Sequence, residues 1–172
     1  MSAANNGPMA GTRVVDLTRI LAGPFCAMML GDMGADIIKV ESPDGDTTRY
    51  TGPCESRDMA SLFLGVNRNK RSIVLDLKLA EARDVLLRLV DTADVFVHNI
   101  RPQKLDKLGL GSEALLKRNP RLVYAGIHGW REDGPYSGRP AYDDIIQGLC
   151  GVAALMDKLT GQPRYAPTIL AD

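Results

Sequence analysis

The stretch RVVDLTRILAGPFCAMMLGDMGADIIKVE, Arg13 to Glu41, decides the fold of this chain. It begins with a short apolar run, Arg13 to Leu17, and ends with a second one, Asp36 to Glu41. Between these runs, Gly23-Pro24 introduces a helical pattern over Phe25 to Gly34. So short a helix between two apolar strands favours a parallel β-α-β crossover. The stretch therefore predicts an α/β fold with a parallel sheet.

The alternation of strands and helices continues toward the end of the chain. The further predicted strands are Ser72 to Leu77, Asp94 to His98 and Arg121 to Ile127. The further predicted helices are Leu79 to Thr92, Lys104 to Leu108, Glu113 to Arg118 with Ser112 as its cap, and Tyr142 to Met156. The segment Ser42 to Ser61 has many turn residues and no apolar period, which indicates a loop long enough to close over a ligand.

The length and composition are those of one globular domain. The chain has 172 residues, of which 45% are hydrophobic and 24% are charged. Met1 to Ala10 has neither the basic start nor the apolar core of a secretory signal, so we expect a flexible arm there. We expect residues 11–172 to form a single domain. No apolar run approaches the roughly 18 residues that span a bilayer, so no membrane association is expected.

The charge balance and the cysteines narrow the class of partner. Lys+Arg and Asp+Glu number 21 each, and a net charge of zero provides no overall attraction to nucleic acid or to an anionic membrane. Cys26, Cys54 and Cys150 are odd in number and have no CxxC spacing, which argues against a disulfide framework and against a structural zinc site. We therefore expect a reducing, cytoplasmic environment.

Several features suggest anion binding without identifying the anion. The turn Leu21 to Pro24 precedes a helix whose first N–H groups favour negative charge, but it lacks the GxGxxG pattern, so a nicotinamide cofactor is disfavoured. Asn67 to Ser72 carries three cations that either meet phosphate oxygens or form a solvated turn. His98 and His128 lie near predicted strand ends, but without a third ligand at metal spacing they predict no metal site.

Five spaced blocks of the sequence together resemble the family III coenzyme A transferases, which include formyl-CoA transferase, carnitine CoA-transferase and the α-methylacyl-CoA racemases. The blocks are Val15 to Arg19 with Ala22 to Phe25, Gly31 to Glu41, Asn67 to Ser72 with Leu75 to Lys78, Leu105 to Gly111, and Asn119 to Tyr124. The resemblance covers nearly the whole chain. It implies a Rossmann-like α/β domain with flanking helices, the N-terminal part of a fold in which two longer chains interlock as a homodimer.

The resemblance also implies which residues act. Asp172, which ends the run Pro163 to Asp172, matches the catalytic nucleophile of the family. The residues that match coenzyme A-binding positions are Leu21, Ala22, Leu75, Asp76, Leu77, Lys78, Asn99, Ile100, Arg101, Lys107, Pro140, Ala141, Tyr142 and Asp143. Ser42 replaces a nucleotide-contacting arginine of some members, so that contact is not expected. No metal and no tightly bound cofactor is implied, because acyl-CoA and a carboxylic acid are the substrates.

The implied activity is the transfer of coenzyme A between carboxylic acids. Attack of a carboxylate on an acyl-CoA thioester forms a mixed anhydride, and the released thiolate returns to form an aspartyl-CoA thioester. In the racemase branch, a histidine and an aspartate act as acid and base where this chain has Tyr142-Asp143. Tyrosine is a weak base at neutral pH, so transfer is favoured over racemisation. A different alternative is a truncated, non-catalytic fragment that binds coenzyme A or dimerises.

Overall fold

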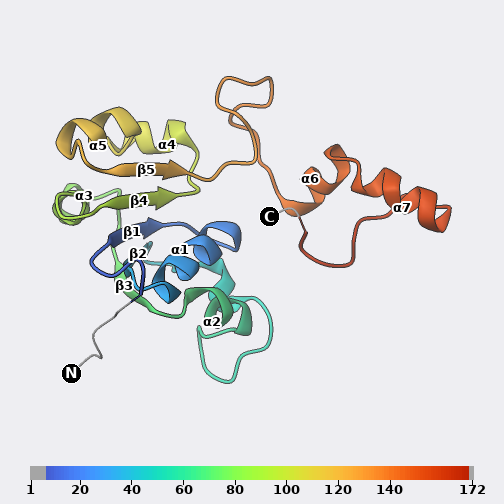
Figure 1. The fold of residues 1–172 in the computed structure, drawn as a ribbon, viewed down its shortest axis with the longest axis horizontal. Coiled ribbons are helices and arrows are strands. Elements are labelled where there is room, and N and C mark those ends of the chain that lie inside the picture. The colour runs from blue at the N-terminus through green and yellow to red at the C-terminus, as the bar shows by residue number, and fades with distance from the viewer. Residues whose placement is uncertain (1–6, 171–172) are drawn as a thin grey trace. The chain divides into compact units, whose positions relative to one another are not determined.

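The computed structural model describes residues 7–170, which form two compact units, residues 7–127 and 128–170. The first unit is built on a sheet of five parallel strands in the order β3-β2-β1-β4-β5 (Figure 1). The strands are β1 (Arg13–Leu17), β2 (Asp36–Glu41), β3 (Lys70–Val74), β4 (Val95–His98) and β5 (Val123–Gly126). The parallel sheet confirms the predicted α/β fold class.

Helices follow the strands in the first unit and make up the ordered elements of the second. The first unit contains α1 (Ala22–Asp32), a short 3-10 helix η1 (Thr47–Tyr50), α2 (Ser61–Asn67), α3 (Ala80–Val90), α4 (Pro102–Lys107) and α5 (Ser112–Arg118). The second unit contains α6 (Asp143–Leu149) and α7 (Val152–Thr160).

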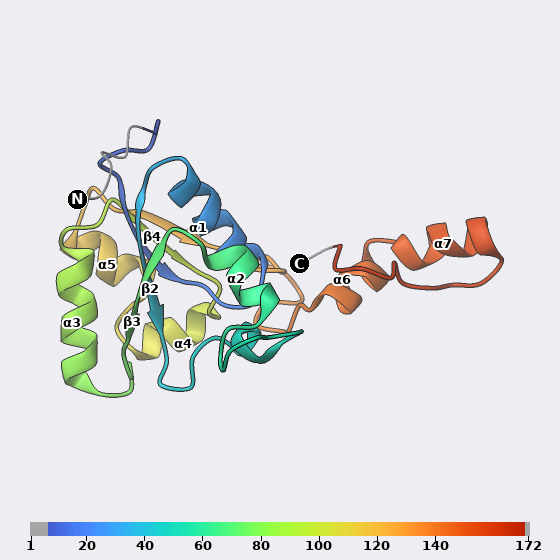
Figure 2. The ribbon, with the colours of Figure 1, turned by 90° about the horizontal axis from the view of Figure 1, so that it is seen from below.

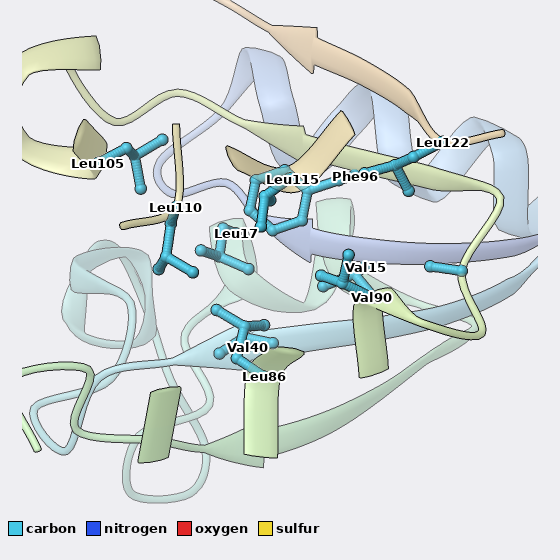
Figure 3. Close-up of a cluster of buried hydrophobic side chains, with 11 residues drawn as sticks. Val15, Leu17, Val40, Leu86, Val90, Phe96, Leu105, Leu110, Leu115 and Leu122 are labelled. Carbon is cyan, nitrogen blue, oxygen red and sulfur yellow. The ribbon is translucent and has the colours of Figure 1, made fainter. Parts of the chain in front are cut away.

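Alternation of side chains along the strands produces an apolar cluster on each face of the sheet. The larger cluster joins three strands to α3, α4, α5 and the segments around them (Figure 3). Its members are Val15, Leu17, Val40, Leu86, Val90, Ala93, Phe96, Leu105, Leu110, Leu115 and Leu122. On the other face, Ala27 of α1 packs with Val14, Ile37 and Val97. Figure 2 shows α1 and α3 on opposite sides of the strands.

Two elements near the edge of the sheet differ from the prediction. Strand β3 begins at Lys70, whose register partner in β2 is Ile37, although we predicted a start at Ser72. A charged residue can begin this strand because its ammonium group has a carboxylate partner inside the unit. Helix α2 was not predicted, because its seven residues bury only Phe63 and Val66 and are too few to show a helical period.

Two helix ends also differ from the prediction. The predicted single helix Tyr142 to Met156 is divided into α6 and α7 at Gly151, whose φ of 89° lies in the left-handed region that glycine adopts without strain. Ser112 is the first residue of α5 and not its cap, because Gly111 occupies the capping position and no side chain caps that end.

Of the predicted arm, residues 1–6 lie outside the described part of the chain. Within the rest, the amide of Met9 donates to the carbonyl oxygen of Met33 at 2.9 Å. Among residues 7–170, no helix is both long enough and apolar enough to cross a bilayer. Cys26, Cys54 and Cys150 are exposed free thiols.

Candidate functional site

The carboxyl edge of the sheet gathers the predicted binding residues of the first unit. Leu21-Ala22 follow β1, Leu75 to Lys78 follow β3, and Asn99 to Arg101 follow β4. Lys107 is the last residue of α4, the helix that begins after Arg101. Strand β1 lies between β2 and β4, so the strand order reverses at β1. In open α/β sheets such a switch point forms the crevice that accepts a ligand.

Exposed cations occur in the segments that follow β3 and β4. The side chains of Lys78, Arg101 and Lys107 are exposed. Ammonium and guanidinium groups in such positions form charge-assisted hydrogen bonds to phosphate oxygens. These three residues are exposed positive charges in a chain whose net charge is zero.

The cations of Asn67 to Ser72 have a different role from the one considered in the sequence. Each of the three cations has a carboxylate partner, so together they form ion pairs and not a freely solvated turn. Arg68 bonds Asp32 at 2.5 Å, Lys70 bonds Asp16 at 3.0 Å, and Arg71 bonds Asp36 at 2.6 Å. These pairs join the start of β3 to α1, β1 and β2.

The turn between β1 and α1 is held by the loop that follows β4. The side-chain oxygen of Asn99 accepts the amide of Arg19 at 3.0 Å, and its side-chain nitrogen donates to the carbonyl oxygen of Arg19 at 2.7 Å. The next residue, Ile20, has a φ of 73°. A β-branched residue rarely adopts this left-handed conformation, so the turn that leads to Leu21 is strained.

Asp46, from the loop after β2, holds the same turn from the other side. It accepts the amide of Ile20 at 3.3 Å, the amide and hydroxyl of Thr48 at 3.1 and 2.9 Å, and the ammonium of Lys39 at 3.1 Å. Lys39 also donates to the carbonyl oxygen of Thr18 at 2.9 Å. Burial disfavours the charged form of Asp46, but Lys39 and the hydrogen bonds from Thr48 lower its pKa below the usual value.

Asp16 of β1 and Lys70 of β3 form a second buried ion pair. The side chains are 0% and 2% exposed, and Asp16 also accepts the amide of Thr18 at 2.8 Å. Burial lowers the pKa of Lys70, although the charge of Asp16 favours its protonated form. Gly23 fits beside this turn because an added Cβ would lie only 2.4 Å from Cβ of Thr18.

Glu41, at the end of β2, organises the loop that was predicted to close over a ligand. It bonds the guanidinium of Arg49 at 2.6 Å and accepts the hydroxyl of Ser72 at 2.5 Å and the amide of Asp46 at 3.1 Å. Burial opposes ionisation of Glu41, yet these bonds lower its pKa to about 2. The guanidinium carbon of Arg49 lies 3.8 Å from the ring centroid of Phe63, which joins the loop to α2.

The predicted site residues of the second unit lie at the start of α6. Tyr142 is 61% exposed, and the carbonyl oxygen of Pro140 accepts the indole N–H of Trp130 at 3.1 Å. Ala141 lies so close to Gly129 that an added Cβ there would be 2.1 Å from Cβ of Ala141. These four predicted residues, Pro140, Ala141, Tyr142 and Asp143, thus cluster within one unit, separate from the ten of the first unit.

Helix α6 also fixes the segment that leads toward the predicted nucleophile. Asp143 accepts the amide of Leu170 at 2.8 Å, and Gln147 accepts the amide of Ala166 at 2.8 Å. The side-chain nitrogen of Gln147, which is 1% exposed, donates to Asp143 at 2.5 Å and to the carbonyl oxygen of Thr168 at 3.3 Å. Asp172 itself lies outside the described residues.

Neither histidine belongs to a metal-ligand cluster formed by residues 7–170. His98 is 1% exposed and packs against the rings of Phe96 and Tyr124, with centroid distances of 6.0 and 5.0 Å. His128 lies 3.8 Å from Glu132. In the described part of the chain, no group of three or more His, Cys, Asp or Glu side chains is arranged to hold a metal ion.

The buried ionic groups at this edge were missed in the sequence. The feature of the sequence that could have indicated them is the strand Asp36 to Glu41. In this strand, Lys39 and Glu41 interrupt an otherwise apolar run that is buried on both faces. A buried charge requires a partner, so such a strand predicts carboxylates and cations nearby. The spacing does not say that the partners are Asp46 and Arg49, because these lie in an irregular loop.

Comparisons with known proteins identify the family of the chain. A family model described as CoA-transferase family III matches residues 9–172. A succinate–glutarate CoA-transferase of Agrobacterium fabrum is 45% identical over 172 residues, covering 96% of this chain and 43% of the relative. An acetyl-CoA:oxalate CoA-transferase of Acetobacter aceti is 44% identical, covering 99% of this chain and 44% of the relative. The chain thus spans less than half the length of these relatives.

Solved structures show the same fold in related proteins. A CAIB/BAIF family protein from Brucella suis superposes with a TM-score of 0.89 at 43% identity, covering 95% of this chain and 44% of that one. The hypothetical protein Rv3272 from Mycobacterium tuberculosis superposes with a TM-score of 0.88 at 38% identity, covering 96% of this chain and 46% of that one.

Proposed function

The chain belongs to CoA-transferase family III, and from this membership we propose that it is the N-terminal part of an acyl-CoA:carboxylate CoA-transferase. The observation that carries the proposal is the convergence of nine of the matched positions on the carboxyl edge of one sheet, where α/β proteins bind ligands. Two of the similar relatives are named for transfer between small carboxylic acids. We therefore propose small carboxylates as donor and acceptor acids.

In the proposed complex, coenzyme A lies along this edge of the first unit. The backbone of Leu21 and Ala22 and the segments Leu75 to Lys78 and Asn99 to Arg101 contact the nucleotide. Lys78, Arg101 and Lys107 offer charge to its phosphates, which is consistent with their exposure. In the second unit, the stretch Pro140 to Asp143 also matches coenzyme A-binding positions of the family. Coenzyme A enters as a substrate and is not a resident cofactor.

The proposed chemistry passes through Asp172. Its carboxylate oxygen attacks the thioester carbonyl, the C–S bond breaks, and the acyl group becomes a mixed anhydride while coenzyme A leaves as the thiolate. The thiolate then attacks the aspartyl carbonyl, which releases the donor acid and forms an aspartyl-CoA thioester. The acceptor carboxylate repeats the sequence in reverse and regenerates Asp172. Anchoring of Ala166 and Leu170 by α6 supports a fixed approach of this segment.

Racemisation is the less favoured activity. It requires an acid and a base on either side of the substrate α-carbon. At the matching position this chain has Tyr142, whose hydroxyl is a weak base at neutral pH. The neighbouring carboxylate of Asp143 already accepts hydrogen bonds from Leu170 and Gln147. Both observations favour transfer.

Replacement of the nucleophile tests the proposal directly. In a form extended to the length of the relatives, Asp172→Ala should abolish transfer from succinyl-CoA or acetyl-CoA to glutarate or oxalate, while coenzyme A affinity stays within about threefold. Incubation of the unsubstituted enzyme with acyl-CoA and hydroxylamine should leave a hydroxamate on Asp172, detected by mass spectrometry. Turnover by the Asp172→Ala variant would refute the assignment.

The alternative for the chain as it stands is a non-catalytic fragment that binds coenzyme A or self-associates. It is favoured by the share of the relatives that the chain covers, 43 and 44%. Turnover by the 172-residue chain itself would exclude it. A homodimer in the extended protein and a cytoplasmic location are part of the same proposal; the latter is supported by the three free thiols.

A further inference from the structure

Ile20 is held in an unfavourable backbone conformation next to the proposed nucleotide site. Its φ is 73°, and a branched Cβ makes this region more costly than it is for most residues. Such a conformation persists only where neighbouring contacts determine it. Ile20 directly precedes Leu21 and Ala22, so its conformation decides where α1 begins and where its first amides lie.

Two side chains from different loops supply the determining contacts. Asn99 uses both of its polar atoms on the peptide of Arg19, at 3.0 and 2.7 Å. Asp46 accepts the amide of Ile20 at 3.3 Å and is itself held by Lys39 at 3.1 Å. The turn is thus fixed from the β4 side and from the β2 side of the switch point.

We propose that Asn99 and Asp46 are positioning residues that keep the strained turn ready to receive coenzyme A. This inference rests on the proposed function, because it assumes that the nucleotide lies against Leu21 and Ala22. It changes the role expected for Asn99. Its amide acts on coenzyme A through the backbone of Arg19, since both of its polar atoms already bond that residue.

A double-mutant cycle separates the two roles of Asn99. Glycine adopts a φ near 73° without strain, so Ile20→Gly removes the need for the contacts that hold the turn. If Asn99 acts through the turn, Asn99→Ala should raise the Kd for coenzyme A by about tenfold in the parent chain but by less than about threefold in the Ile20→Gly background. Isothermal titration calorimetry with coenzyme A measures all four proteins.

Two control variants make the result specific. Asn119 also bonds the backbone of another segment, because its side chain donates to the carbonyl oxygens of Val90 and Ala93 at 2.9 Å. This contact lies at the amino end of β4, away from the β1–α1 turn. Asn119→Ala should leave the Kd for coenzyme A unchanged. Lys78→Ala removes a proposed phosphate contact, so its effect on Kd should be the same in the parent chain and in the Ile20→Gly background.

The Kd for coenzyme A in the two backgrounds distinguishes a positioning role of Asn99 from a direct contact. An equal rise in Kd in both backgrounds would show that Asn99 contacts coenzyme A directly. An unchanged Kd in both would show that the hydrogen bonds between Asn99 and Arg19 have no part in binding. Either result overturns the inference. Similar losses from Asn119→Ala and Asn99→Ala would overturn it too, because general destabilisation would then explain both.

Amide hydrogen exchange tests the hydrogen bonds between Asn99 and Arg19 without any ligand. The Arg19 and Ile20 amides should be protected in the parent chain, and Asn99→Ala should accelerate the exchange of Arg19 while the amides of β1 and β4 keep their protection. Lack of protection at Arg19 in the parent chain would show that Asn99 does not hold the Arg19 amide in solution. Failure of the parent chain to bind coenzyme A, with Arg19 protected, would instead count against the nucleotide site and with it the positioning role.

Discussion

Lys39 lies in the middle of an apolar strand, yet its side chain is only 1% exposed. The ammonium group bonds Asp46, whose side chain is 0% exposed, and the carbonyl oxygen of Thr18. Removal of one member of a buried pair leaves the other charge without compensation, and the cost is larger than for an exposed pair. The pair therefore matters for stability as well as for the position of the β1–α1 turn.

We predict that Lys39→Met lowers the free energy of unfolding by about 3 kcal/mol. Arg118→Met is the matched control, because the pair that Arg118 forms with Asp91 has both side chains 41% exposed. The control should change stability by no more than about 1 kcal/mol. Urea denaturation followed by circular dichroism measures both variants. Equal losses would show that burial does not determine the contribution of these pairs.

Glu41 predicts a dependence of stability on pH. Its pKa falls from the ordinary 4.5 to about 2 in the folded chain. The stabilisation from its ionised form is therefore complete above about pH 4.5 and is lost as the pH falls through about 2. Glu41→Gln should cost about 2 kcal/mol at pH 7, because hydrogen bonds to a charged group are replaced by weaker ones.

The pH profile of the same variant provides the test. The difference between the parent chain and Glu41→Gln should shrink between pH 4.5 and 2, because protonated Glu41 resembles glutamine. Thermal unfolding at a series of pH values measures this difference. A difference that stays constant over that range would contradict the lowered pKa.

For single residues, the sequence indicates which side chains belong to the candidate site better than it indicates their hydrogen-bond partners. The resemblance named Asn99 and Asp143 as binding residues, but it did not indicate that Asn99 bonds the backbone of Arg19 or that Asp143 bonds the amide of Leu170. Both contacts join segments that are far apart in the chain. Their geometry depends on the strand order and on irregular loops, which periodicity does not describe.

Helix α6 connects the predicted contact stretch to the segment before Asp172. Gln147 is the buried residue of this helix, and its amide group bonds Ala166, Thr168 and Asp143. A buried amide with three such partners stabilises one arrangement of the segment. The helix is therefore expected to affect catalysis and not only folding.

We predict that Gln147→Leu lowers kcat at least about tenfold in the extended enzyme while KM for acyl-CoA changes less than about threefold. Gln162→Leu is a matched control, since Gln162 is exposed and bonds only Arg164 among the described contacts that involve its side chain. Steady-state kinetics with succinyl-CoA measures both variants. An unchanged kcat with a lower melting temperature would indicate a purely structural role.

Elements with a clear period were the ones that the sequence predicted well. Strand β2 was predicted with its observed bounds, because Ile37, Ile38 and Val40 make it mostly apolar and turn residues follow it. Helix α2 was missed because it is short, and the break between α6 and α7 was missed because Gly151 resembles a tolerated helical glycine. Thus the order of strands and helices is readable, whereas short helices and local breaks depend on packing.

The second unit exposes several large apolar side chains. Helix α7 buries none of its residues, and Leu155 and Leu159 are 61 and 80% exposed. Tyr165 and Ile169 are also more than half exposed. Large exposed apolar areas normally mark an interface. The chain spans less than half of its curated relatives, so we expect it to self-associate when it is present alone.

This expectation is testable with charge substitutions. Leu155→Lys with Leu159→Lys should reduce the concentration-dependent increase in light scattering at least about twofold, because the apolar face then carries two cations. Leu64→Lys, at a leucine of the first unit that is 49% exposed, controls for the effect of added charge. Equal reduction by the control would show that net charge, and not the surface of α7, governs association.

The alignment of Asp16 with Lys39 restricts the register in which β1 and β2 can pair. These residues are register partners in β1 and β2. A shift of β2 by one position would turn Lys39 toward the apolar cluster that contains Val15 and Leu86, where no carboxylate would neutralise it. The buried charges therefore select against misregistered sheets, and chains that pair wrongly during folding remain unstable enough to separate and pair again.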